Sequence, residues 1–345
     1  MNGIYMSNNE KECAYMSEMR KNKLTQEWII YAENRQKRPY EFEKSLLKKE
    51  KRNTPCPFCR GNECQTTPAL YQDREQNWSI RVFPNRFPAV QYDDNPKIVE
   101  EAFYEAIPAF GRHEVVVDTP HHEQTIEQFS LEHLQNVLSV LQKRFIDIKS
   151  TKGIQQIQLF KNAGVDAGMS IKHSHWQLVG LPTVSKRQLT YQNTSLDYHK
   201  QHNHCILCDM ILWEKQQKIR VCCETEHFIA IAPYASRFSY EVWILPKKHI
   251  SSFALLEQKE LNDFAFILQK MLKRIKQLRE DISYNICFIE GGTEQVQKYS
   301  DSLHWSVQIL PRIGGFAALE FATESYINSI LPETAAKWYR SEEKE

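Results

Sequence analysis

The chain has 345 residues, which is enough for two ordinary domains or one large duplicated unit. Its 44 lysines and arginines nearly balance its 43 aspartates and glutamates, which argues against a dedicated nucleic-acid or membrane-surface binding protein, because such proteins usually carry a basic excess. A hydrophobic content of 41% is typical of a globular protein, and no apolar run approaches the roughly 20 residues that span a bilayer.

Residues 1–23 are polar and rich in Met, Glu and Lys, and they lack the apolar core of a signal peptide, so we expect a flexible N-terminus. The nine cysteines are then expected to stay reduced in the cytoplasm. Metal binding or burial explains them better than a disulfide framework does. Four of them form two C-x-x-C pairs, Cys56/Cys59 and Cys205/Cys208.

Five predicted elements follow one another in the same order in each half of the chain. They are an apolar strand ending at a proline, a strand that begins Glu-Val and closes on histidine, an amphipathic helix, a further strand and a histidine motif. The segments are 78–84, 114–122, 131–145, 155–160 and 173–177 in the first half, and 228–233, 241–249, 261–275, 285–289 and 304–308 in the second. This repetition indicates an internal duplication rather than two unrelated domains.

The repeat sets the expected fold and its boundaries. We predict an α+β fold of two tandem halves, each a mostly antiparallel sheet with a packed helix. The first half covers 24–190 and the second covers 191–345. Their joint falls in the stretch 186–204, which is polar and rich in Gln, Asn, Tyr and Thr.

The first C-x-x-C pair is spaced to place two thiolates on one metal ion from a tight turn. Redox pairs usually open a helix after a strand, whereas prolines surround Cys56 and Cys59. His122 and His173 could complete a Cys2His2 tetrahedron, and zinc suits these ligands. His121 competes with His122, and the repeat favours His122. The second half offers Cys205, Cys208, His249 and His304 at corresponding places.

Other histidines can equally be satisfied surface or core residues. These are His113, His202, His204 and His227.

The motif His-Ser-His-Trp-Gln at 173–177 holds the reactive candidate. On a strand, alternate residues share a face, so His173, His175 and Gln177 point the same way. A neutral imidazole at His175 is a competent nucleophile toward phosphorus, and Gln177 could donate to a phosphoryl oxygen. In the second half Ser306 takes the place of His175, so we expect one active centre per chain.

The segment 162–170 precedes this motif. It contains Asn162 and Ser170 as well as two glycines, Gly164 and Gly168. Glycines let backbone N–H groups approach an anion closely, so this segment is a candidate phosphate loop.

With these motifs in view, the chain resembles the galactose-1-phosphate uridylyltransferase family. That family belongs to the histidine-triad superfamily and includes sugar-nucleotide phosphorylases of the ADP-glucose type. The resemblance covers nearly the whole chain. It rests on the histidine motif and its loop, the zinc knuckle at 56–59, and the segments 34–39, 81–88, 309–312 and 326–333.

The resemblance implies two histidine-triad-like halves and a nucleotidyltransferase that acts on nucleoside diphosphate sugars and sugar 1-phosphates. His175 would attack the α-phosphorus to give a nucleotidyl-histidine, and the zinc in the first half would be structural. The resemblance also suggests a homodimer. The residues that it assigns to substrate, in addition to Gln177, are Arg35, Arg38 and Ser170 for the phosphates, Asn85 for the nucleoside and Glu320 for the sugar. Asn162 is a further candidate for substrate binding.

The motifs depart from the family's usual pattern at three places. The second histidine pair, used for an additional metal in some members, is reduced to His304-Trp-Ser306, and the Cys205/Cys208 pair could replace the missing ligand. Trp176 replaces a small residue, and its place on the opposite face of the strand favours a core role. Arg86 stands where some uridylyltransferases carry an acid, which leaves the base and the sugar open. Three functions are therefore considered: transfer to a sugar phosphate, a phosphorylase or hydrolase of nucleotide sugars or dinucleoside polyphosphates, and a non-catalytic zinc-stabilised binding protein.

Overall fold

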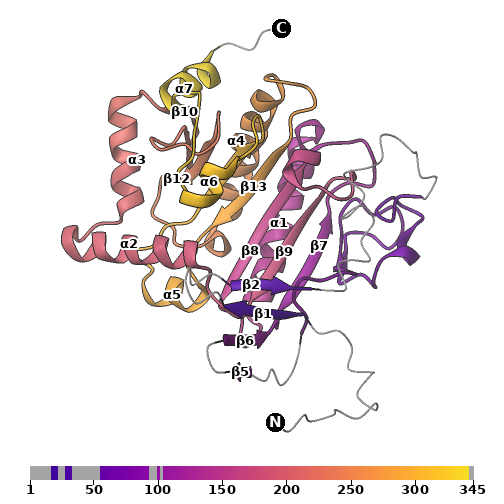
Figure 1. Ribbon diagram of the computed structural model, residues 1–345. Coiled ribbons are helices and arrows are strands. Elements are labelled where there is room, and N and C mark those ends of the chain that lie inside the picture. The colour runs from indigo at the N-terminus through magenta and orange to yellow at the C-terminus, as the bar shows by residue number, and fades with distance from the viewer. Residues whose placement is uncertain (1–16, 22–27, 33–54, 93–98, 102–103, 342–345) are drawn as a thin grey trace.

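The structure of the protein is a computed structural model that describes residues 17–21, 28–32, 55–92, 99–101 and 104–341. Figure 1 shows these residues as coloured ribbon. The segment 1–23, expected to be flexible, includes strand β1, which pairs with strands β2 and β6. Residues 1–16, 22 and 23 of that segment lie outside the described part of the chain.

In each half the long helix lies between strands, in the order that the repeat predicted. The strands are β1 (Glu18–Lys21), β2 (Trp28–Tyr31), β3 (Tyr71–Gln72), β4 (Arg81–Pro84), β5 (Val99–Glu101), β6 (Tyr104–Pro108), β7 (Arg112–Val117), β8 (Gln156–Ala163), β9 (His175–Leu181), β10 (Val221–Glu224), β11 (Phe228–Ile231), β12 (Val242–Pro246), β13 (Tyr284–Ile289) and β14 (Ser306–Pro311). The helices are α1 (Leu131–Lys149), α2 (Lys186–His202), α3 (Ile206–Gln217), α4 (Gln258–Lys276), α5 (Thr293–Lys298), α6 (Ala318–Thr323) and α7 (Pro332–Arg340). Strands β4 and β7 precede α1, which β8 and β9 follow, and β11 and β12 precede α4, which β13 and β14 follow.

Ten of the strands form one antiparallel sheet that runs through both halves. Its order is β10-β11-β12-β14-β13-β8-β9-β7-β4-β3. The halves join where β13 pairs with β8, with Asn285 opposite Asn162 and Cys287 opposite Phe160. Four other strands form a smaller sheet in the order β2-β1-β6-β5. The predicted α+β class is confirmed, and the two halves share one sheet.

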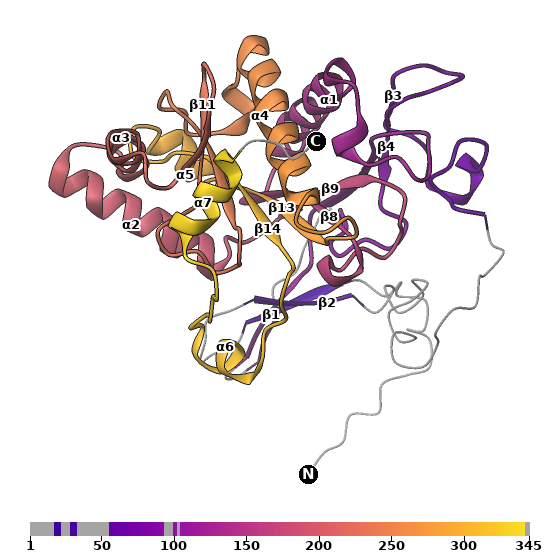
Figure 2. The ribbon, with the colours of Figure 1, turned by 90° about the horizontal axis from the view of Figure 1, so that it is seen from above.

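The core lies between this sheet and the two long helices. Helices α1 and α4 pack against each other on one face of the sheet, whereas α6 and the small sheet lie on the other side (Figure 2). Both helices present an apolar stripe, as the spacing of their leucines predicts. Trp176 is fully buried in this core and meets the ring of Phe288 edge-on, with 6.2 Å between ring centroids. This agrees with the core role expected for it.

The stretch around the joint between the halves is helical. Helix α2 begins after Ser185, whose hydroxyl accepts the N–H of Gln188, and it ends at Asn203 in the left-handed region. Its buried residues are Gln188, Gln192 and Ser195, all of them polar. No apolar periodicity marks this helix, which is why the sequence predicted only a polar connection.

Candidate functional site

The first cysteine–histidine set forms one cluster. The possible ligand atoms of Cys56, Cys59, His122 and His173 all lie within 4.8 Å of one another. The Cys59 sulfur is 3.5 Å from Nδ1 of His122 and 3.5 Å from Nδ1 of His173. His173 donates its Nε2–H to the Thr119 carbonyl at 2.7 Å, so its Nδ1 lone pair points into the cluster. The structure therefore brings together His122, rather than His121, with the knuckle.

The second set repeats this geometry in the other half. Cys205, Cys208, His249 and His304 also place their possible ligand atoms within 4.8 Å of one another. The Cys208 sulfur lies 3.2 Å from Nδ1 of His249 and 3.5 Å from Nδ1 of His304. Both histidines donate their Nε2–H to backbone carbonyls, at 2.7 Å and 3.1 Å. Each half therefore carries a cluster that could hold a metal ion.

His175 opens strand β9 directly after the first cluster. Its Nδ1–H donates to the His173 carbonyl oxygen at 2.8 Å, so the lone pair sits on Nε2. The residue is 7% exposed, and its desolvation lowers the pKa of the imidazole to about 4. Desolvation also lowers the pKa of His173. His175 is thus held neutral with a defined nitrogen available as a nucleophile.

Gln177 lies two residues further along the same face and contacts a residue that the motif does not include. Its Oε1 is 3.0 Å from Nε2 of His113, which lies on the neighbouring strand β7. His113 pairs with Val179, which is two residues from Gln177 on β9. Because alternate residues of a strand share a face, His113 and Gln177 lie on the same face of the sheet. The Asn85 amide nitrogen is 3.1 Å from the same Nε2. Asn85, predicted at the nucleoside, is therefore linked to Gln177 through His113.

The glycine loop is fixed by residues of the second half. Gly164 and Gly168 adopt φ of 86° and 81°, a region that favours glycine. A Cβ on Gly164 would lie 2.1 Å from the Ser283 hydroxyl, so the loop packs directly on the start of β13. Asn285 donates from Nδ2 to Asn162 Oδ1 and to the Ala167 carbonyl, both at 2.9 Å.

A buried ion pair lies beneath the first residues of β9. Lys161, 3% exposed, donates to Asp118 Oδ2 at 2.7 Å, and Asp118 is fully buried. The same ammonium group donates to the Ser174 hydroxyl at 2.7 Å and to the His175 carbonyl at 3.2 Å. Lys161 therefore ties the backbone of His175 to strand β8.

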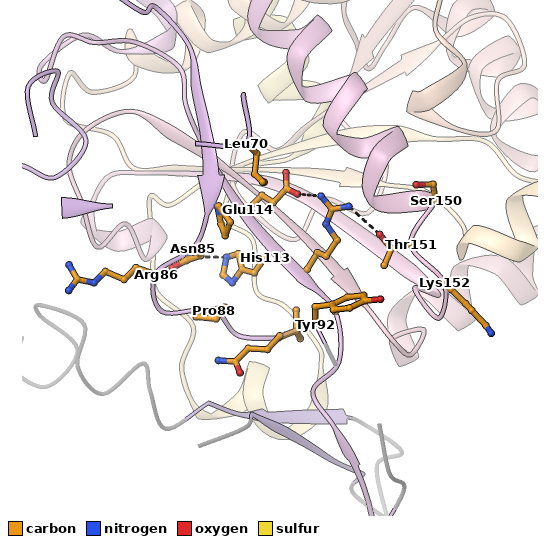
Figure 3. A pocket seen from close by; sticks show the side chains of 15 residues that line it. Leu70, Asn85, Arg86, Pro88, Tyr92, His113, Glu114, Ser150, Thr151 and Lys152 are labelled. Carbon is orange, nitrogen blue, oxygen red and sulfur yellow. Dashed lines mark hydrogen bonds and ion pairs between the residues drawn. The ribbon is translucent and has the colours of Figure 1, made fainter. Parts of the chain in front are cut away.

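A cavity of about 810 Å³ opens beside β7 where β4 leaves the sheet. Figure 3 shows Asn85 and His113 facing each other on its wall, with Arg86, Tyr92 and Lys152 around it. His175 does not line this cavity. The cavity adjoins the reactive face through the contact between Asn85 and His113.

The remaining predicted residues are placed differently. Arg35 and Arg38 lie outside the described residues. Ser170 is partly buried in the loop before the histidine motif. Glu320 lies on α6, where its carboxylate accepts the N–H of Ala317 at 2.9 Å. Within the described part of the chain, no polar contact joins Glu320 to the residues around His175.

The second half keeps the frame of this site without the imidazole. Ser306 is 2% exposed at the start of β14. Gln308, two residues on, accepts from Arg237 at 3.2 Å and from Arg187 at 3.4 Å. The position of Gln177 in the first half is thus occupied by a glutamine that is bonded to arginine side chains.

Sequence reasoning did not assign His113, Asn285, Lys161 or Asp118 to the site. Their contributions depend on which strands pair, and pairing across strands leaves little trace in a single sequence. One signal was available for His113, because it immediately precedes the repeated Glu-Val pair.

Comparison with known proteins agrees with this geometry. The family model for the N-terminal domain of galactose-1-phosphate uridyl transferase matches residues 6–210, and the model for its C-terminal domain matches residues 191–310. An ADP-glucose phosphorylase of Arabidopsis thaliana is 32% identical over 328 residues, covering 94% of this chain and 92% of its own. A galactose-1-phosphate uridylyltransferase of Thermotoga maritima is 27% identical over 338 residues, covering 96% and 100%.

The solved structures agree with these relatives. The crystal structure of an ADP-glucose phosphorylase from Arabidopsis thaliana with bound ADP-glucose shares 30% identity with a TM-score of 0.75, covering 95% of this chain and 100% of that one. The resemblance read from the motifs is confirmed: the chain belongs to the galactose-1-phosphate uridyl transferase family of nucleotidyltransferases.

Proposed function

We propose that the protein transfers a nucleotidyl group from a nucleoside diphosphate sugar through a covalent intermediate on His175. The observation that carries this proposal is the hydrogen bond from His175 Nδ1 to the His173 carbonyl, which leaves the Nε2 lone pair as the nucleophile. Gln177 shares its face of the strand and can donate an amide N–H to the phosphoryl group.

The reaction would proceed in two displacements at phosphorus. Nε2 of His175 attacks the α-phosphorus, so that a P–N bond forms and the bond to the bridging oxygen breaks. Sugar 1-phosphate leaves with the electron pair of that bond. A phosphate oxygen of the acceptor then attacks the same phosphorus, and the electron pair of the P–N bond returns to Nε2. Such a sequence gives ping-pong kinetics.

The phosphates would bind between the glycine loop and the predicted arginines. The hydrogen bonds from Asn285 to Asn162 and to the Ala167 carbonyl fix this loop, which supports the placement. Ser170 lies at the end of the loop. Arg35 and Arg38 remain proposals drawn from the family resemblance, because a guanidinium binds phosphate oxygens bidentately. Further proposals from the same source place the nucleoside toward Asn85 and its cavity, and the sugar at Glu320.

Two versions of this activity differ in the acceptor of the nucleotidyl group. The relative that is 32% identical is an ADP-glucose phosphorylase, which supports inorganic phosphate as acceptor and ADP-glucose as donor. The relatives named galactose-1-phosphate uridylyltransferase support a sugar 1-phosphate as acceptor. Both versions share the step on His175.

We propose that each cysteine–histidine cluster binds zinc. Tetrahedral zinc, with bonds of about 2.3 Å to sulfur and about 2.0 Å to nitrogen, keeps these ligand atoms roughly 3.5 Å apart. The sulfur–nitrogen distances of 3.2–3.8 Å in both clusters fit this requirement. The first ion would join the Cys56–Cys59 turn to His122 and to His173, two residues before His175, rather than contact substrate.

A homodimer in the cytoplasm completes the proposal. Phe321, Ile327 and Leu331 in the C-terminal segment are 69–77% exposed, which supports burial against a second copy. Light scattering on the purified protein tests this. Of the helices that the structure describes, none has the length and apolar character to cross a bilayer.

The proposed activity is tested with ADP-glucose and UDP-glucose labelled in the α-phosphate. The wild type should retain label after denaturation, and His175→Ala should retain none. Ser306→Ala, at the matching position of the second half, is the control and should label like the wild type. Inorganic phosphate and glucose 1-phosphate are then offered to the labelled protein to identify the acceptor. If neither nucleotide sugar labels the wild type, the proposal is refuted.

A further inference from the structure

We propose that His113 is a positioning residue that sets which end of the Gln177 amide faces the phosphoryl group. This inference rests on the proposed function, because it concerns the same transfer step. His113 lies on β7, outside the histidine motif, and both His113 and Gln177 are more than nine-tenths buried. Hydrogen bonds between such buried groups hold a fixed geometry, because water does not compete for them.

The proton of His113 is located by a backbone group. The Ala89 N–H donates to Nδ1 of His113 at 3.0 Å, so Nδ1 carries a lone pair and no proton. The imidazole must then carry its proton on Nε2. The same loop holds His113 from behind, because Asn85 N–H donates to the His113 carbonyl at 2.8 Å.

Of the two described side chains that contact Nε2 of His113, one presents an acceptor. Asn85 Oδ1 accepts the N–H of Phe87 at 2.9 Å, which turns the Asn85 amide nitrogen toward His113. That nitrogen is a donor, so across its 3.1 Å contact with Nε2 it cannot accept the His113 proton. The acceptor is therefore Oε1 of Gln177, at 3.0 Å.

This bond decides how Gln177 meets the substrate. With Oε1 occupied by His113, the NH2 group is the end left to face the reacting phosphoryl group. The opposite orientation would place the amide oxygen against negatively charged phosphoryl oxygens. A chain of fixed donors therefore runs from the Ala89 backbone through His113 to Gln177, and it presents the NH2 group before substrate arrives.

Three substitutions separate this positioning from mere packing. Because the Gln side chain places its amide nitrogen near the position of Nε2, His113→Gln can still donate to Gln177. His113→Asn has the shorter side chain and cannot reach it. His113→Glu presents an acceptor, which would turn the Gln177 amide so that its oxygen faces the phosphoryl group.

The measurement is the single-turnover rate of labelling of the full-length protein by α-labelled ADP-glucose or UDP-glucose, whichever labels the wild type. We expect His113→Gln to keep most of the rate and His113→Asn to lose about tenfold or more, with KM little changed. His113→Glu should fall at least to the rate of Gln177→Ala. Adding His113→Asn to Gln177→Ala should cost little more, because the two residues act through one interaction.

The thermal unfolding temperature and the zinc content of each variant are measured as well. Values equal to those of the wild type would show that a folding defect does not cause the loss of labelling rate. Equal rates for the Gln, Asn and Glu variants would overturn the inference, as would additive losses in the double variant. Its failure is distinct from failure of the proposed function. In the first case the wild type still labels at His175, whereas in the second no label forms at all.

Discussion

The buried pair of Lys161 and Asp118 gives a prediction whose size follows from its surroundings. The two side chains are 3% and 0% exposed and 2.7 Å apart. Lys161→Met keeps the length of the side chain but strands a buried carboxylate. Removing one partner of a buried pair costs about 3–5 kcal/mol, because the remaining charge stays buried without the opposite charge that was bonded to it. We therefore expect the free energy of unfolding to fall by about that amount.

The double variant Lys161→Met/Asp118→Leu should regain most of this stability, because it removes the stranded charge as well. It should still label slowly at His175, since the donor to the Ser174 hydroxyl and the His175 carbonyl is gone. Urea titration followed by tryptophan fluorescence gives the free energies, and labelling kinetics give the rate. A loss of less than about 1 kcal/mol in the single variant would refute the reasoning, which rests on the cost of a buried unpaired charge.

The remaining predictions address other parts of the structure. Asn285→Ala removes two hydrogen bonds from the glycine loop, and at about 0.5–1.5 kcal/mol each it should slow labelling roughly tenfold while zinc content stays unchanged. Trp176→Ala should lower the free energy of unfolding by about 3–5 kcal/mol in urea titration, because it opens a cavity in the core. Burial raises the pKa of Glu290 to about 7, above the ordinary 4.5, so its contribution to stability is full below pH 4.5 and is lost as the pH rises toward 7. Glu290→Gln should therefore gain stability relative to the wild type between those pH values, and parallel curves in unfolding at several pH values would argue against this assignment. Cys205→Ser/Cys208→Ser should retain one zinc per chain by elemental analysis, against two in the wild type; two ions in the variant would mean that the second cluster is not a site.

Parts of the site could be predicted from the sequence because their chemistry imposes spacing. A C-x-x-C turn provides two ligands of a tetrahedral metal site, and histidines at strand ends can provide the other two. The second copy of the motifs favoured His122 over His121. Strand alternation placed His175 and Gln177 on one face and Trp176 in the core. The inferences on strand β9 use neighbours within a few residues, for which local geometry is nearly fixed, whereas the metal sites were found because the same residue types recur in the same order in both halves.

The rest depended on contacts between distant segments. The pairing of β13 with β8 brings Asn285 to Asn162 across more than a hundred residues, and no local pattern specifies that register. His113 meets Gln177 only because β7 pairs with β9. Helix α2 buries polar side chains, so it lacks the apolar period by which the sequence could have marked it.

The measurement that tests the central claim most directly is the mass of the intact protein after reaction with the nucleotide sugar, quenched in alkali to preserve a phosphoramidate bond. One active centre per chain predicts a single nucleotidyl adduct, which peptide mapping should assign to His175. Two adducts per chain, or one adduct on a different residue, would contradict the account that only the first half kept its nucleophile.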